Sequence, residues 1–140
     1  ILSFTTEEIY QLVKEERDKD SIHLETFVKV PGSWKDENLN KEWDQIKRIR
    51  DIANISIESK RADKEIGSSL ESVIHIKLKK NLFNIAEKRD FSEICITSDA
   101  KIENDENIQD EIVVTANKAE GFKCPVCWKI KKDPCERHSK

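Results

Sequence analysis

The amino-acid sequence predicts an α+β fold, and three features of the chain support this prediction. Apolar residues recur at three- and four-residue steps in the first half, as they do in amphipathic helices. In the second half, short apolar runs alternate with polar residues, as in half-buried strands. Three of the four cysteines lie near the end of the chain and indicate a metal site. We therefore expect a helical segment at 1–66, a small α/β module at 67–120 and a metal-binding knuckle at 121–140.

The composition limits the size of the core and the classes of partner. The 140 residues suffice for one domain or two small ones, and 38% of them are charged against 36% hydrophobic. The net charge of -3 gives no overall basic signal for nucleic acid, so an RNA site would depend on local patches. No apolar run approaches the ~20 residues that span a membrane, and we expect neither a signal peptide nor a membrane partner. The chain contains no methionine, even at position 1, and we expect it to be part of a longer protein.

Two helices are expected in the first half. The threonine pair at 5–6 precedes two acidic residues and can cap a helix that runs to about Lys19. The segment between the helices, 21–27, is expected to be extended. The longest periodic segment, 40–64, predicts a second helix that ends before Gly67. We expect the apolar stripe of this helix to pack on the first helix.

The second half is expected to alternate between strands and helices. The predicted elements are strands at 70–78, 91–97 and 111–116, a helix at 79–88 and an acidic loop at 99–110. We interpret His75 as an exposed strand residue and Cys95 as a small apolar side chain in a buried strand. Neither residue is therefore expected to bind a metal ion.

The segment 123–138 holds the pattern that carries chemistry. Cys124 and Cys127 form a Cys-x2-Cys pair, and after seven residues Cys135 and His138 form a Cys-x2-His pair. Two such knuckles can surround one zinc ion with four ligands, which makes the site structural and leaves no open position for catalysis. Because so short a segment buries little apolar surface, zinc would supply its folding free energy, about 10 kcal/mol. A disulfide with one spare cysteine and a redox Cys-x-x-Cys are the alternatives.

Four stretches, in order along the chain, resemble the C-terminal region of bacterial isoleucyl-tRNA synthetases. They are Ile-Leu-Ser-Phe-Thr-Thr-Glu-Glu-Ile at 1–9, Ser-Ile-His-Leu at 21–24, Lys-Glu-Ile-Gly-Ser-Ser-Leu-Glu at 64–71 and Lys-Cys-Pro-Val-Cys-Trp at 123–128. The chain departs from the family pattern at Val126, where the family usually has arginine, and at His138, which stands in place of a cysteine. Three cysteines and one histidine still form a zinc-binding set.

The resemblance implies a cytoplasmic class I ligase that joins isoleucine to its tRNA with ATP. The catalytic motifs of that family, His-Ile-Gly-His and Lys-Met-Ser-Lys-Ser, do not occur here, so this chain would hold no catalytic residues. It would comprise the end of the helical anticodon-binding domain at 1–66, the small module at 67–120 and the zinc knuckle at 121–140. Its partners would be tRNA and the rest of the synthetase chain, in a monomeric enzyme that binds neither DNA nor a membrane.

The expected RNA contacts are basic or aromatic residues of the long helix and of the zinc knuckle. They are Arg50, Arg61, Lys64, Trp128, Lys129, Lys131, Lys132 and Arg137. The helix residues can equally form a solvated face that acids balance, and Trp128 can pack on the metal site as a lid. A free-standing zinc-stabilised module that binds RNA or protein is the alternative function. A purely structural interaction domain is a third, and it would fold with metal but bind no RNA.

Overall fold

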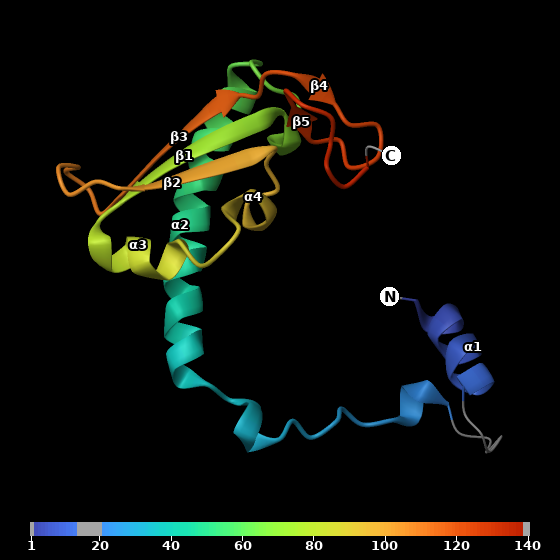
Figure 1. Cartoon of the computed structure of the whole chain (residues 1–140). Helices are drawn as coiled ribbons and strands as arrows, with labels where there is room; N and C mark the ends of the chain where they lie inside the picture. Colours follow the sequence, from blue (N-terminus) through green and yellow to red (C-terminus); the bar gives the residue numbers. More distant parts are fainter. Residues whose placement is uncertain (1, 14–20, 139–140) are drawn as a thin grey trace. The chain divides into compact units, whose positions relative to one another are not determined.

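The computed structural model describes residues 2–13 and 21–138, and it divides the chain into two compact units, 1–36 and 37–140 (Figure 1). The predicted α+β fold is confirmed, because a helical segment comes first, strands follow it, and a cysteine-histidine cluster lies at the end. None of the described helices is both long and apolar enough to cross a membrane.

The described residues of the first unit form one helix and two short 3-10 turns. Helix α1 spans Ser3–Val13 and buries no residue. Residues 14–20, where we expected this helix to end, lie outside the described residues. The turn η2 spans Gly32–Trp34.

The expectation of an extended segment at 21–27 was wrong at its start. Residues Ile22–Leu24 form the 3-10 turn η1 because Ser21 caps it. The Ser21 hydroxyl accepts a hydrogen bond from the His23 backbone N–H at 3.2 Å and donates one to the Glu7 carboxylate at 2.7 Å. Side-chain hydrogen bonds of this kind compete with extended structure.

Helix α2, at Glu37–Ala62, packs on the sheet of its own unit, so the expectation that its stripe covers the first helix was wrong (Figure 1). Its apolar stripe, Ile46, Ile49, Ala53 and Ile57, is fully buried, as the periodicity predicts. The Ser56 hydroxyl accepts a hydrogen bond from the Ala116 backbone N–H at 2.9 Å and ties the helix to strand β3. The compact unit therefore begins at residue 37, whereas the predicted module begins at 67.

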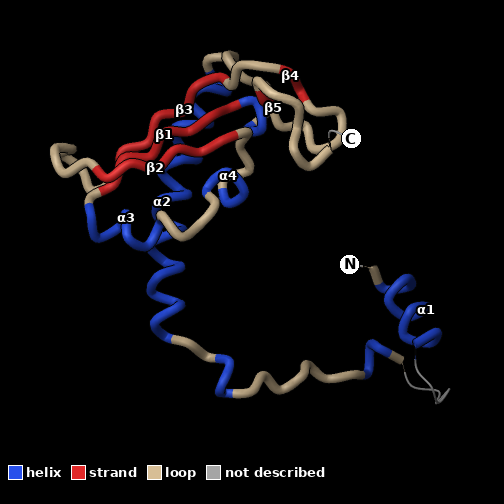
Figure 2. The backbone as a smooth tube through the Cα atoms, viewed as in Figure 1, coloured by secondary structure: helices blue, strands red, loops and turns tan. Residues whose placement is uncertain are grey.

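The sheet has three strands in the order β2-β1-β3 (Figure 2). The central strand β1, at Ser72–Leu78, pairs in parallel with β2, at Asp99–Asn104, and antiparallel with β3, at Ile112–Lys118. Alternate residues of β1 are buried against the helices. Helices α3, at Lys80–Ala86, and α4, at Phe91–Ile94, connect β1 to β2.

Two predicted elements in this connection were wrong. The segment 91–97 is not a strand but helix α4 and a turn, because Asp90 caps the helix by accepting hydrogen bonds from the backbone N–H groups of Ser92 and Glu93 at 2.8 and 3.3 Å. Ile96 has φ 55, a left-handed conformation that no strand contains. The predicted acidic loop at 99–110 begins with strand β2, which carries polar residues because it lies at the edge of the sheet.

Candidate metal centre

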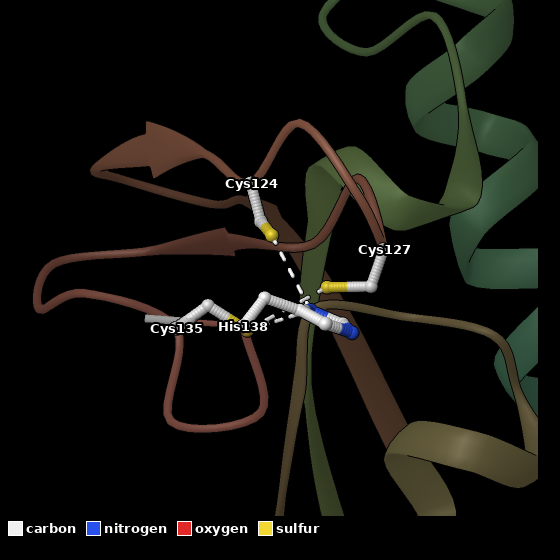
Figure 3. Close-up of side chains that lie close together, drawn as sticks. All are labelled: Cys124, Cys127, Cys135 and His138. Carbon is white, nitrogen blue, oxygen red and sulfur yellow. Dashed lines mark hydrogen bonds between the residues drawn. The ribbon is translucent and has the colours of Figure 1, made fainter. Parts of the chain in front are cut away.

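Four side chains from two tight turns converge beside the sheet (Figure 3). They are Cys124, Cys127, Cys135 and His138, and their donor atoms all lie within 4.8 Å of one another. The Nδ1 atom of His138 lies 3.5 Å from the Cys124 sulfur and 3.4 Å from the Cys135 sulfur. The sulfurs of Cys127 and Cys135 are 3.7 Å apart.

These separations fit one tetrahedral zinc ion. Zinc–sulfur bonds of about 2.3 Å and zinc–nitrogen bonds of about 2.0 Å, at tetrahedral angles, place two sulfurs about 3.8 Å apart and a sulfur and a nitrogen about 3.5 Å apart. A disulfide would bring two sulfurs to about 2.05 Å, and all four cysteines of the chain are free thiols. The donor set therefore fits zinc, and four protein ligands would close the coordination shell.

The first turn also stabilises a thiolate. The backbone N–H groups of Cys127 and Val126 donate to the sulfur of Cys124 and lower the pKa of this thiol to about 6. The turn is closed by two backbone hydrogen bonds, from Trp128 N to Cys124 O at 3.0 Å and from Cys124 N to Lys129 O at 2.9 Å. Zinc binds the deprotonated form of cysteine, so this turn prepares one ligand before the metal arrives.

A short hairpin carries the first turn. Strand β4, at Phe122–Lys123, pairs antiparallel with β5, at Ile130–Lys131. Gly121 precedes the hairpin with φ 130, and a Cβ atom there would lie 2.2 Å from the Lys131 carbonyl oxygen. Only glycine permits this approach, so Gly121 is required for the hairpin. The sequence analysis did not predict these two strands, because two-residue strands carry no periodic signal.

The sequence of this chain matches known proteins over both units. Residues 1–78 match the family model described as the anticodon-binding domain of tRNA ligase. The chain belongs to this family. It is 60% identical to the isoleucine–tRNA ligase of Pelagibacter ubique over 99% of its length. The identity to the enzymes of the same name from Agrobacterium fabrum and Caldicellulosiruptor saccharolyticus is 36% over 95% of the chain and 41% over 93%. The matched regions make up 15%, 14% and 14% of these three proteins, so the chain spans a small part of its relatives.

Two of the predicted RNA contacts, Lys129 and Arg137, connect the metal centre to helix α4. The Lys129 ammonium group donates to Glu93 Oε1 at 2.8 Å and to the Ser92 hydroxyl at 3.2 Å. Arg137, next to the ligand His138, lies 3.6 Å from the same Glu93 oxygen. The hydrogen bond from Lys129 lowers the pKa of Glu93. The Glu93 carboxylate therefore contacts one residue beside each turn, Lys129 and Arg137.

A buried hydroxyl makes a second connection. Ser98 is fully buried, its hydroxyl donates to the Leu70 carbonyl, and it accepts a hydrogen bond from the Ile130 N–H at 2.6 Å. Ser98 therefore joins strand β5 to the start of β2. Neither Glu93 nor Ser98 is predicted from the sequence, because a single acid or serine in a polar chain carries no local signal.

The remaining predicted contacts of the metal segment are exposed and do not pair with Glu93. Trp128 is 59% exposed, adopts φ 65, and has the Lys123 ammonium group 5.8 Å from its ring centroid. Lys132 pairs with Glu120 at 3.0 Å, and both of these side chains are largely exposed. Lys131 lies on β5, opposite Phe122.

The three predicted RNA contacts on helix α2 and at its end, Arg50, Arg61 and Lys64, lie near carbonyl or carboxylate oxygens. Arg50 donates from Nε to the Ile94 carbonyl at 3.1 Å, and Arg61 pairs with Glu58 at 2.9 Å. Lys64 takes the left-handed conformation, with φ 60, that closes the helix end, a role that the sequence analysis assigned to Gly67. Arg61 and Lys64 share a shallow depression with three glutamates, Glu58, Glu65 and Glu71.

Proposed function

We propose that this chain is the tRNA-binding, non-catalytic C-terminal part of an isoleucine–tRNA ligase. The observation that carries the proposal is the similarity to isoleucine–tRNA ligases over 99% of the chain, across both compact units. In this proposal the whole protein is a monomeric cytoplasmic class I synthetase that uses ATP to attach isoleucine to tRNA and binds no DNA. Residues 1–66 end its anticodon-binding domain, 67–120 form the small module, and 121–140 form the zinc knuckle. Helix α2 then lies within the anticodon-binding domain in the sequence, although it packs on the sheet of the small module.

Zinc has a structural role in this proposal. Cys124, Cys127, Cys135 and His138 would hold it, and a closed shell of four protein ligands activates no water. The ion would join the two turns and fix the surface that Trp128 and its neighbouring lysines present. Because the bases of an anticodon loop are unpaired, a rigid surface with an exposed aromatic ring and cations can stack on them and contact their phosphates.

The eight candidate RNA contacts fall into three groups. Lys129 and Arg137 share Glu93, which supports a positioning role for them in addition to any contact with phosphate. Trp128, Lys131 and Lys132 are exposed and do not pair with Glu93, which makes them the strongest candidates. Arg61 and Lys64 remain candidates for a second contact region, where nearby carboxylates would reduce their affinity for phosphate. Arg50, which donates to the Ile94 carbonyl, remains a candidate as well.

A titration of the zinc-loaded 140-residue chain tests the proposal. The chain is titrated with isoleucine tRNA and with a non-cognate tRNA at low and physiological salt, before and after chelation. We expect tighter binding to the cognate tRNA, and we expect chelation to abolish that preference. Equal binding to both tRNAs that disappears at physiological salt, or no binding, would contradict anticodon recognition by this chain.

A charge-matched pair of variants separates local contacts from general electrostatics. Replacement of Lys131, Lys132 and Arg137 with alanine should weaken tRNA binding and reduce its salt dependence. Replacement of Lys41, Lys88 and Lys101, which are exposed elsewhere in the same unit, removes the same charge and should have a smaller effect. If the two triple variants weaken binding equally, the metal segment is not a specific contact.

A further inference from the structure

A pocket of about 410 Å³ lies against the metal centre. Phe122, Lys131, Lys132 and Pro134 line it together with the metal ligands Cys124, Cys135 and His138. All donor atoms of the metal site lie within 4.8 Å of one another, and three of their separations are 3.4–3.7 Å, which leaves room for a single ion among them. The pocket therefore extends outside the metal site, and its volume falls within the ~300–1,000 Å³ that is typical of small-molecule sites.

Phe122 gives this pocket an accessible aromatic face. The residue is 83% exposed, so its ring contributes little to the core. Its backbone is nevertheless held firmly, because β4 pairs with β5 and Gly121 lets the two strands approach closely. The paired backbone limits where the ring can lie, and its exposed face is open to a flat partner.

The charge around the pocket is positive. Lys123, Lys131 and Lys132 line it, whereas Asp133 is its only acidic lining residue in the described part of the chain. Lys131 stands opposite Phe122 in the hairpin register, so a cation accompanies the ring. His138 directs Nδ1 toward the sulfurs, so a metal-bound His138 would carry its proton on Nε2 and could donate a hydrogen bond there.

We propose that this pocket takes one unpaired nucleotide of an RNA, with the base stacked on Phe122 and a phosphate beside Lys131 and Lys132. Every base has a face that can stack on an aromatic ring, whereas a base within a duplex is covered by its neighbours. This inference rests on the proposed function, since it assumes that the metal segment meets RNA. It adds Phe122, which the sequence analysis did not select, and it assigns the nucleotide to a site other than the exposed ring of Trp128.

The test compares an unpaired with a paired RNA. The zinc-loaded chain is titrated with a hairpin that contains the anticodon stem and loop of isoleucine tRNA, and with a fully paired RNA duplex of equal length. We expect the chain to prefer the hairpin, and we expect Phe122→Ala to weaken hairpin binding about tenfold while duplex binding stays unchanged. Phe122→Trp should retain the affinity, and Phe122→Leu should lose it, because leucine keeps the apolar bulk without the aromatic face.

Ile55→Ala is the control. Ile55 is an exposed apolar residue of helix α2 in the same unit and lies outside the pocket lining, so we expect its replacement to leave hairpin binding unchanged. Zinc content and circular dichroism of each variant establish that the fold is intact. If the wild-type chain prefers the hairpin but Phe122→Ala and Phe122→Leu bind it normally, the pocket proposal fails and the proposed function stands. If Phe122→Ala weakens hairpin and duplex equally, the site is not specific for an unpaired base. If the wild-type chain binds neither hairpin nor tRNA, both proposals fail.

Discussion

Two regions of the unit 37–140 differ in how much apolar surface they bury: the sheet unit, which is the sheet with its covering helices at 37–118, and the metal segment at 121–138. The core of the sheet unit, formed by residues from Ile46 to Ala116, contains almost all of the buried apolar side chains. In residues 121–138, by contrast, Cys124 alone is buried. Apolar burial at about 25 cal/mol per Å² can hold the first region together, but it has almost nothing to act on in the second. This small chain therefore contains one part that buries an apolar core and one part that buries little but brings four possible metal ligands together.

Removal of one metal ligand should separate the two parts most clearly. We expect Cys135→Ala to lose most of the roughly 10 kcal/mol that a structural zinc ion supplies, so that 121–138 loses its order while the sheet unit stays folded. Zinc content and hydrogen exchange of the two regions measure this outcome. Cys95→Ala is the control, because Cys95 is buried outside the metal cluster and should alter stability without altering zinc content. Full zinc retention by Cys135→Ala would remove Cys135 from the ligand set.

A cavity in the apolar core should have the next largest effect. Ile49 is fully buried on helix α2, and we expect Ile49→Ala to cost about 2–5 kcal/mol of unfolding free energy. Ile55, on the exposed face of the same helix, provides the control, and Ile55→Ala should change stability by less than about 0.5 kcal/mol. Urea unfolding followed by circular dichroism measures both. Equal costs would show that α2 does not pack on the sheet as described.

The hairpin glycine should give an intermediate effect confined to the metal segment. Gly121→Ala places a methyl group against the Lys131 carbonyl at a positive φ, and we expect it to cost more than about 1 kcal/mol and to weaken zinc binding. Gly32→Ala meets nothing within 4 Å, so it serves as the control. Competition with a chelator measures zinc affinity for both variants. An unchanged affinity for Gly121→Ala would mean that the hairpin does not support the metal site.

The smallest predicted effect concerns the cap of helix α4. The side-chain hydrogen bond with Ser92 lowers the pKa of Asp90. A carboxyl group with a lowered pKa stabilises the fold above its unfolded pKa of about 3.9, and this stability is lost as the pH falls through the folded value. We expect Asp90→Ala to cost about 1 kcal/mol at neutral pH and little in acid, as measured by urea unfolding between these limits. A cost that does not change with pH would assign the effect to packing instead of the charged cap.

The sequence predicts well what depends on periodicity and spacing. The stripe of α2, the alternation in β1 and the two cysteine-containing turns all repeat at fixed steps, and the structure contains each of them. The segment 91–97 was predicted wrongly because a run of isoleucine and cysteine favours a strand, whereas the Asp90 cap and the burial of Phe91 decide for a helix. Strand β2 was missed because its edge position lets it carry charged residues. Glu93 and Ser98 gain their importance from partners far along the chain, which no local pattern reveals.

The order of the strands also has a consequence for synthesis of the chain on the ribosome. Helix α2 precedes its partner strand β3, and the hydrogen bond between Ser56 and Ala116 spans 60 residues. At translation rates of about 5–20 residues per second, roughly 3–12 s pass between the synthesis of these two residues. During that interval the isoleucine stripe of α2 has no sheet to cover it. Each nascent chain therefore offers chaperones an apolar helix for several seconds before its fold can close.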